Sequence, residues 1–124
     1  MSIYSKIRDL LINDITLQNL LLVTETNKKV YFHFPKGTTI EENVPCITYY
    51  FIETPEVWKD AQSSKDGMFF IDIWSKDNLN DIYERVLELL ADVPFSADLI
   101  QAIDVFENDT QIYHKHINIK VLGG

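Results

Sequence analysis

The stretch Met68–Asp92, MFFIDIWSKDNLNDIYERVLELLAD, holds a β-strand pattern that is followed at once by an α-helix pattern. Successive side chains of a strand point to opposite faces, which gives two groups: Phe69, Ile71 and Ile73 on one face, and Met68, Phe70, Asp72 and Trp74 on the other. Apolar residues then recur at helical spacing: Leu79, Ile82, Val86, Leu89 and Leu90. The stretch therefore predicts a strand leading into an amphipathic helix, with Asp81 and Arg85 placed to pair on its exposed side.

The preceding strand pattern, CITYYFIE at residues 46–53, is also apolar or aromatic on both alternating faces. An antiparallel sheet usually keeps one face polar for solvent, whereas a sheet that is apolar on both faces needs cover on both. We expect the protein's own helices to cover one face and another chain to cover the second face.

The rest of the chain supplies the other layers. An amphipathic helix is predicted at residues 2–14, with Asn13 or Asp14 capping a short helical turn after it. Strand patterns lie at residues 29–34, 99–107 and 112–122, and a loop is expected at 35–45. We predict one domain over residues 1–124: an α+β fold with a mainly antiparallel sheet of about five strands and two amphipathic helices packed on one face.

Composition and charge exclude several classes of protein. Nineteen acidic against eleven basic residues give a net charge of −8, the wrong sign for tight binding of nucleic acid. No apolar run reaches the roughly 18 residues of a membrane-spanning helix, and the first residues lack a secretion pattern. We therefore expect no membrane association. The single cysteine, Cys46, cannot form an internal disulfide and is expected to be a buried thiol.

Few residues of the sequence are candidates for metal binding or catalysis. His114 and His116 lie two apart on a strand and could bind a metal, but the sequence marks no third ligand. We expect them, like His33, to be ordinary strand residues. Asp72 lies in an apolar strand without an identifiable histidine or acidic partner, which favours a structural role or a subunit contact. No catalytic residue, metal ligand or cofactor is predicted.

The connector between the two central strands, TPEVWKDAQSSKDG at residues 54–67, is long for a hairpin loop. Its tryptophan could fold back onto the sheet. Alternatively it could anchor an interface, where tryptophan is enriched among the residues that dominate binding. On the second alternative, the predicted interface residues are Val57, Trp58, Tyr50, Phe70, Asp72 and Trp74.

The order of these motifs resembles a known family. The segments IRDLLINDITLQNLL, KVYFHFPKG and VPCITYYFIE, then MFFIDIWSKD with LNDIYERVLELLAD, and finally IYHKHINIKV follow one another as in the tail completion proteins of tailed bacteriophages and prophages. This family is also called the tail terminator or head-to-tail joining proteins. The resemblance covers nearly the whole chain.

The resemblance implies a non-enzymatic virion protein, assembled in the bacterial cytoplasm, that caps the tail tube as a ring, typically hexameric. Its partners would be copies of itself, the tail tube protein, the head connector or head-completion protein, and DNA passing through the lumen without specific binding. We expect part of the acidic surplus to line that lumen.

Two alternatives stay open. One is a small ligand-binding module or enzyme in which Asp72 and His114 or His116 converge within hydrogen-bonding distance. The other is a cytoplasmic tail-assembly factor that never enters the particle.

Overall fold

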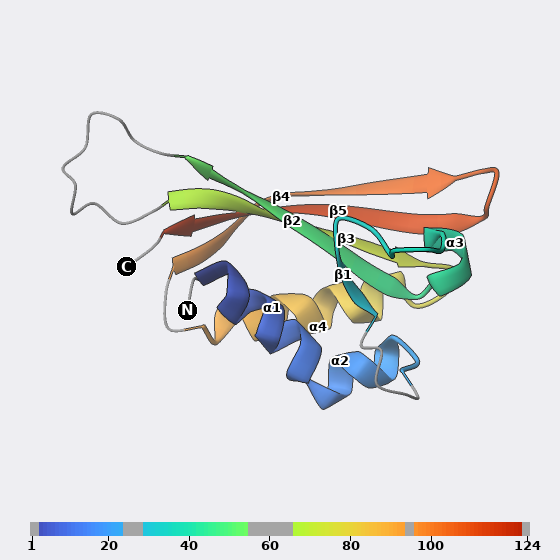
Figure 1. Cartoon of the computed structure of the whole chain (residues 1–124), viewed down its shortest axis with the longest axis horizontal. Coiled ribbons are helices and arrows are strands. Elements are labelled where there is room, and N and C mark those ends of the chain that lie inside the picture. Colours follow the sequence, from blue (N-terminus) through green and yellow to red (C-terminus); the bar gives the residue numbers. More distant parts are fainter. Residues whose placement is uncertain (1–2, 24–28, 55–65, 94–95, 123–124) are drawn as a thin grey trace.

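The computed structural model describes residues 3–23, 29–54, 66–93 and 96–122. These form a five-stranded, mostly antiparallel sheet with helices, which confirms the predicted α+β class (Figure 1). The elements follow in the order α1 (Ile3–Asn13), α2 (Ile15–Leu20), β1 (Val30–Phe32), α3 (Ile40–Asn43), β2 (Cys46–Thr54), β3 (Asp66–Ser75), α4 (Leu79–Ala91), β4 (Ser96–Glu107) and β5 (Ile112–Leu122).

The strands lie in the order β1-β2-β3-β5-β4, so β1 and β4 are the two edges of the sheet that the described residues form. All neighbours are antiparallel except β1 and β2, which run parallel. The register places Asp72 of β3 directly between Thr48 of β2 and His116 of β5. This position in the middle of the sheet decides the surroundings of Asp72.

The loop predicted at residues 35–45 contains the short helix α3, a difference from the prediction. Thr39 caps it, because its hydroxyl accepts a hydrogen bond from the backbone N–H of Glu42 at 3.2 Å. The spacing Thr39-x-x-Glu42 is that of a capping box, and this hydrogen bond is the first of the two that the motif describes. Four residues are enough for one turn, which the apolar pattern does not reveal.

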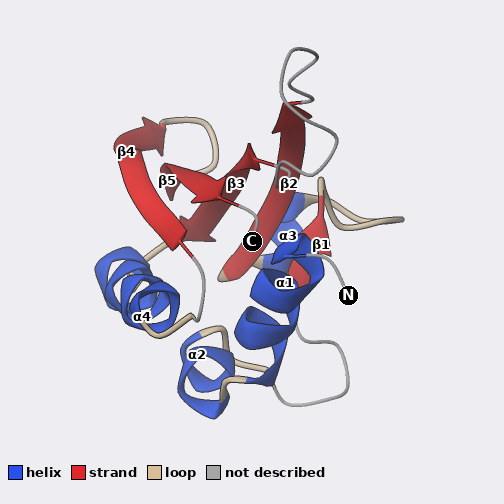
Figure 2. Ribbon diagram, turned by 90° about the vertical axis from the view of Figure 1, so that its left-hand side faces the viewer, coloured by secondary structure: helices blue, strands red, loops and turns tan. Residues whose placement is uncertain are grey.

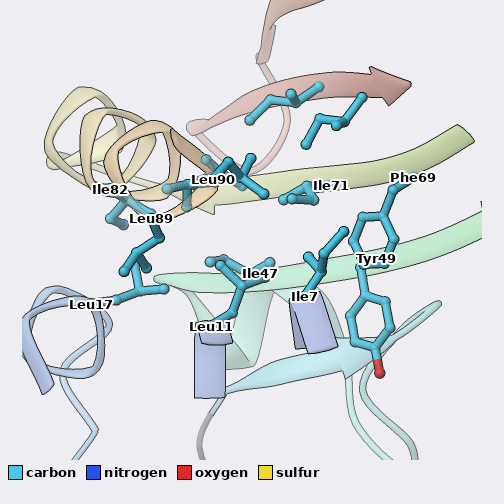
Figure 3. Close-up of a cluster of buried hydrophobic side chains, with 14 of the residues drawn as sticks. Ile7, Leu11, Leu17, Ile47, Tyr49, Phe69, Ile71, Ile82, Leu89 and Leu90 are labelled. Carbon is cyan, nitrogen blue, oxygen red and sulfur yellow. The ribbon is translucent and has the colours of Figure 1, made fainter. Parts of the chain in front are cut away.

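The core lies between the sheet and the helices α1, α2 and α4, which share one side of the sheet (Figures 1 and 2). One of the two predicted faces of β3, that of Phe69, Ile71 and Ile73, is fully buried there. Figure 3 shows the side chains of α1, α2 and α4 meeting those of β2 and β3 in this layer. The predicted alternation of β3 is therefore confirmed.

Polar contacts tie the helices together. The Asp14 carboxylate caps α2 by accepting the N–H of Leu17 at 2.8 Å, as predicted for this position. The same carboxylate accepts two hydrogen bonds from the Arg85 guanidinium, at 2.9 and 2.6 Å. Arg85 thus binds Asp14 and also Glu88, and the predicted pairing with Asp81 is wrong. The two hydrogen bonds from Arg85 to Asp14 are stronger than a single ion pair with Asp81 on the same helix would be.

We call the side of the sheet away from α1, α2 and α4 the open face. The helix α3 reaches it at the β1 edge, where the Tyr31 hydroxyl donates to the Asn43 side chain at 3.1 Å. Strand register assigns the following described side chains to the open face: Cys46, Thr48, Tyr50 and Ile52 of β2; Met68, Phe70, Asp72 and Trp74 of β3; Asp98, Gln101, Ile103 and Val105 of β4; His114, His116, Asn118 and Lys120 of β5.

Candidate assembly surface and the Asp72 cluster

Asp72 and two histidines form a cluster on the open face. The Asp72 Oδ1 atom lies 2.7 Å from Nε2 of His114 and 2.5 Å from Nδ1 of His116. The side chains are 12%, 16% and 27% exposed for Asp72, His114 and His116. The sequence identifies neither a histidine partner for Asp72 nor a third ligand beside the histidine pair, and the structure supplies both.

The electrostatics of the cluster follow from this geometry. Burial on its own would raise the pKa of Asp72, but the hydrogen bonds from His114 and His116 outweigh it and hold that pKa below its usual value. Asp72 is therefore an anion that two imidazole rings stabilise. A carboxylate in the middle of an apolar strand is tolerated because it is paired.

Aromatic rings flank the cluster on both sides along the strands. The Trp74 indole stacks on the His114 ring with centroids 3.7 Å apart and donates its N–H to the Thr48 hydroxyl at 3.0 Å. On the other side the Phe70 ring stacks on His116 at 5.8 Å and on Tyr50 at 4.6 Å. The rings of the two histidines are thus held in place by neighbours on β2 and β3.

Four of the predicted interface residues, Tyr50, Phe70, Asp72 and Trp74, lie together on this face through β2–β3 register. Their contact with a partner stays a prediction. The other two, Val57 and Trp58, lie outside the described residues.

A second surface, on the edge strand β4, was not predicted. Large apolar side chains on both of its faces are 41% to 57% exposed: Leu99, Ile100, Ile103, Val105 and Phe106. An edge strand has unpaired backbone N–H and C=O groups along one side, which makes it a template for another chain. The sequence shows that the apolar residues of β4 follow no single alternation, but the position of β4 at an edge comes from the strand order.

The opposite edge of the sheet also exposes aromatic side chains. Phe32 of β1 is 50% exposed, Phe34 beyond it 61%, and Phe51 of β2 37%. The rings of Phe32 and Phe51 lie 5.9 Å apart. The described sheet therefore has an apolar surface at each of its two edges.

A groove of about 690 Å³ lies between the start of α4 and the β4–β5 hairpin, with Leu79, Phe106 and Tyr113 in its wall. Lys115 also lines the groove. Its Nζ atom forms an ion pair with Asp104 at 3.1 Å and lies over the ring of Tyr83. This groove lies on the helical side of the sheet. The Asp72 cluster lies on the open face and is not among its lining residues.

The described residues define a class of fold: a small α+β protein in which α1, α2 and α4 cover one face of the sheet. No known family description matches the sequence, and no curated protein matches it. The fold is nevertheless similar to that of a chain in a solved structure described as the virion of a native gene transfer agent particle. The TM-score is 0.64 at 12% identity, over 99% of this chain and 96% of that one. Identity this low shows a shared fold over nearly the full length.

None of the helices in the described part of the chain is long and apolar enough to cross a membrane.

Proposed function

We propose that this chain is a structural protein of a phage-like particle, and that it completes the tail by capping the tail tube as a ring and joining it to the head connector. Two observations support the proposal. The fold matches a chain of a gene transfer agent virion over nearly its whole length. The order of sequence motifs resembles the tail completion family.

The observation that carries the assembly part of the proposal is the pair of apolar sheet edges. The β4 edge exposes Ile100 and Phe106, and the β1 edge exposes Phe32 and Phe34. These are different surfaces at opposite ends of one sheet. A contact between two different patches is head-to-tail, and such contacts close into a ring when the rotation permits.

On this proposal β4 of one copy packs against the β1 edge of the next copy. The strand β4 is the stronger template of the two, because it has twelve residues against three in β1. Its backbone groups can add hydrogen bonds to the burial of its apolar side chains. We expect a hexamer from the family resemblance, and the open face then remains for the tail tube protein or the head connector.

The net charge of −8 fits a lumen through which DNA passes without specific binding, because like charge prevents adhesion. A ring structure tests this directly: we expect a negative potential along the lumen, and a positive lumen would contradict the idea.

A second candidate function, a small ligand-binding module or enzyme, has one observation in its favour. Asp72, His114 and His116 do converge within hydrogen-bonding distance, as that alternative requires. The cluster lies on an open sheet face among stacked rings, where a covering protein would contact it as readily as a small ligand. The third candidate, a cytoplasmic assembly factor, differs from a virion protein by its absence from purified particles.

Deletion of the gene, followed by electron microscopy, tests the proposed function. Loss of a tail completion protein should leave filled heads and separate tails, with tails of abnormal length. Complementation with the Ile100→Lys variant should fail, because a charge on β4 opposes burial of that edge.

The matched control is Ile15→Lys, which changes an isoleucine that is 77% exposed on α2, on the helical side of the molecule. This variant should restore normal particles. Normal particles from the deletion strain, or equal rescue by both variants, would refute the proposal.

A further inference from the structure

We propose that Asp72, His114 and His116 form a binding site for a divalent transition-metal ion of the zinc type, with one coordination position open on the open face. The three residues each offer one ligand atom, and these atoms all lie within 4.8 Å of one another. They come from two adjacent strands in fixed register, since Asp72 pairs directly with His116 and His114 lies two residues earlier on the same face.

The spacing suits a metal ion after small side-chain rotations. Zinc binds nitrogen and oxygen at about 2.0–2.2 Å, so tetrahedral ligand atoms stand roughly 3.3 Å apart. Without metal, Oδ1 of Asp72 lies 2.7 Å from His114 and 2.5 Å from His116, because it accepts a hydrogen bond from each ring. An ion between the three atoms would replace those hydrogen bonds. Each ring would then carry its proton on the other nitrogen, as a neutral imidazole allows.

The types of ligand decide the class of ion. Two imidazoles and one carboxylate suit zinc, cobalt, nickel or copper, whereas magnesium and calcium prefer a full set of oxygen ligands. Three protein ligands leave a fourth tetrahedral position, which a water molecule would occupy in the isolated chain.

The surroundings hold the ligands in place. The His114 ring lies against the Trp74 indole. The indole is held in turn by the hydrogen bond that its N–H donates to the Thr48 hydroxyl. The His116 ring lies against Phe70. Orientation of the ligating rings by neighbouring groups lowers the entropic cost of binding an ion. With 16% and 27% of the histidine side chains exposed, an ion can still enter from the open face.

Titration of the purified, tag-free chain with Zn²⁺ and Co²⁺ tests the site, and it is independent of any role in a particle. We expect one ion per chain by calorimetry, visible absorption bands of low-symmetry Co²⁺, and a raised Tm in the presence of excess Zn²⁺. His114→Gln and His116→Gln should each weaken Zn²⁺ binding by about 100-fold or more, since even loss of a residue that only orients a ligand costs about 10–100-fold.

The matched control is His33→Gln, which changes a histidine that lies outside the cluster, against the Tyr50 ring. This variant should bind Zn²⁺ as the wild type does. Absence of saturable one-to-one binding would overturn the proposal, as would wild-type affinity in both cluster variants or displacement of Zn²⁺ by equimolar Mg²⁺. Circular dichroism of each variant in the absence of metal shows whether it is folded, and the more exposed His116 position keeps the test decisive if another variant does not fold.

Discussion

Two phenylalanines face each other across β2 and β3, and substituting each in turn compares a core position with an exposed position of the sheet. Phe69 and Phe51 are direct cross-strand partners with rings 6.3 Å apart, but Phe69 is fully buried and Phe51 is 37% exposed. Phe69→Ala should lower the free energy of unfolding by about 3–5 kcal/mol, the range for a buried phenylalanine that leaves a cavity. The stacking of Phe69 on Tyr49, at 5.6 Å, is lost as well.

Phe51→Ala should cost much less, about 1–2 kcal/mol, because part of its surface is already in water and its neighbours can relax. Urea unfolding curves of the two variants give the comparison, with the midpoint shifted and the slope unchanged in each. Equal costs for the two substitutions would refute the assignment of Phe69 to the core and of Phe51 to the exposed edge. A larger cost for Phe51→Ala would do the same.

Two further predictions follow from the titrating groups. The Arg85 guanidinium holds the pKa of Asp14 in the folded protein below its usual value. Asp14 therefore stabilises the fold at pH values above its unfolded pKa of about 3.9. This stability is lost as the pH falls through the lowered pKa of the folded state. Asp14→Asn keeps the helix cap and should flatten that part of the acid unfolding curve, whereas an unchanged curve would contradict the assignment. Burial raises the pKa of Cys46 to about 12, so alkylation at neutral pH should be slow in the folded protein and become fast in denaturant. Fast alkylation of the native chain would show that the thiol is accessible.

Alternation and helical periodicity predicted the main elements because those patterns come from burial of one face. The inward set of Phe69, Ile71 and Ile73 is fully buried, and β5 has the predicted bounds of residues 112–122. The parallel pairing of β1 could not be read in this way, since a three-residue strand carries no signal of direction.

The Asp72 cluster depends on strand register, which local patterns do not contain. Alternation in the sequence places His114 and His116 on one face of a strand and Asp72 on another, apolar strand. That β3 lies beside β5, with Asp72 opposite His116, follows from the order β1-β2-β3-β5-β4. Only the three-dimensional pairing of distant segments brings a carboxylate on to the histidine pair.

The exposed β4 edge was missed for a related reason. Its sequence resembles a buried strand, because apolar residues such as Ile100 and Ile103 lie on both alternations. In the structure β4 pairs with β5 on one side and is the edge of the described sheet on the other. A strand that is apolar on both faces and lies at an edge is unusual for an isolated subunit, which favours burial by a second copy.

Site-specific cross-linking in assembled particles tests the edge-to-edge contact most directly. A photo-reactive residue replacing Ile100 on β4 should link to the β1 edge of another copy, at residues 30–34 or at Phe51, when the linked peptides are identified by mass spectrometry. Links only to other proteins of the particle, or from β4 to β4 of another copy, would contradict a ring built from head-to-tail contacts between the two edges.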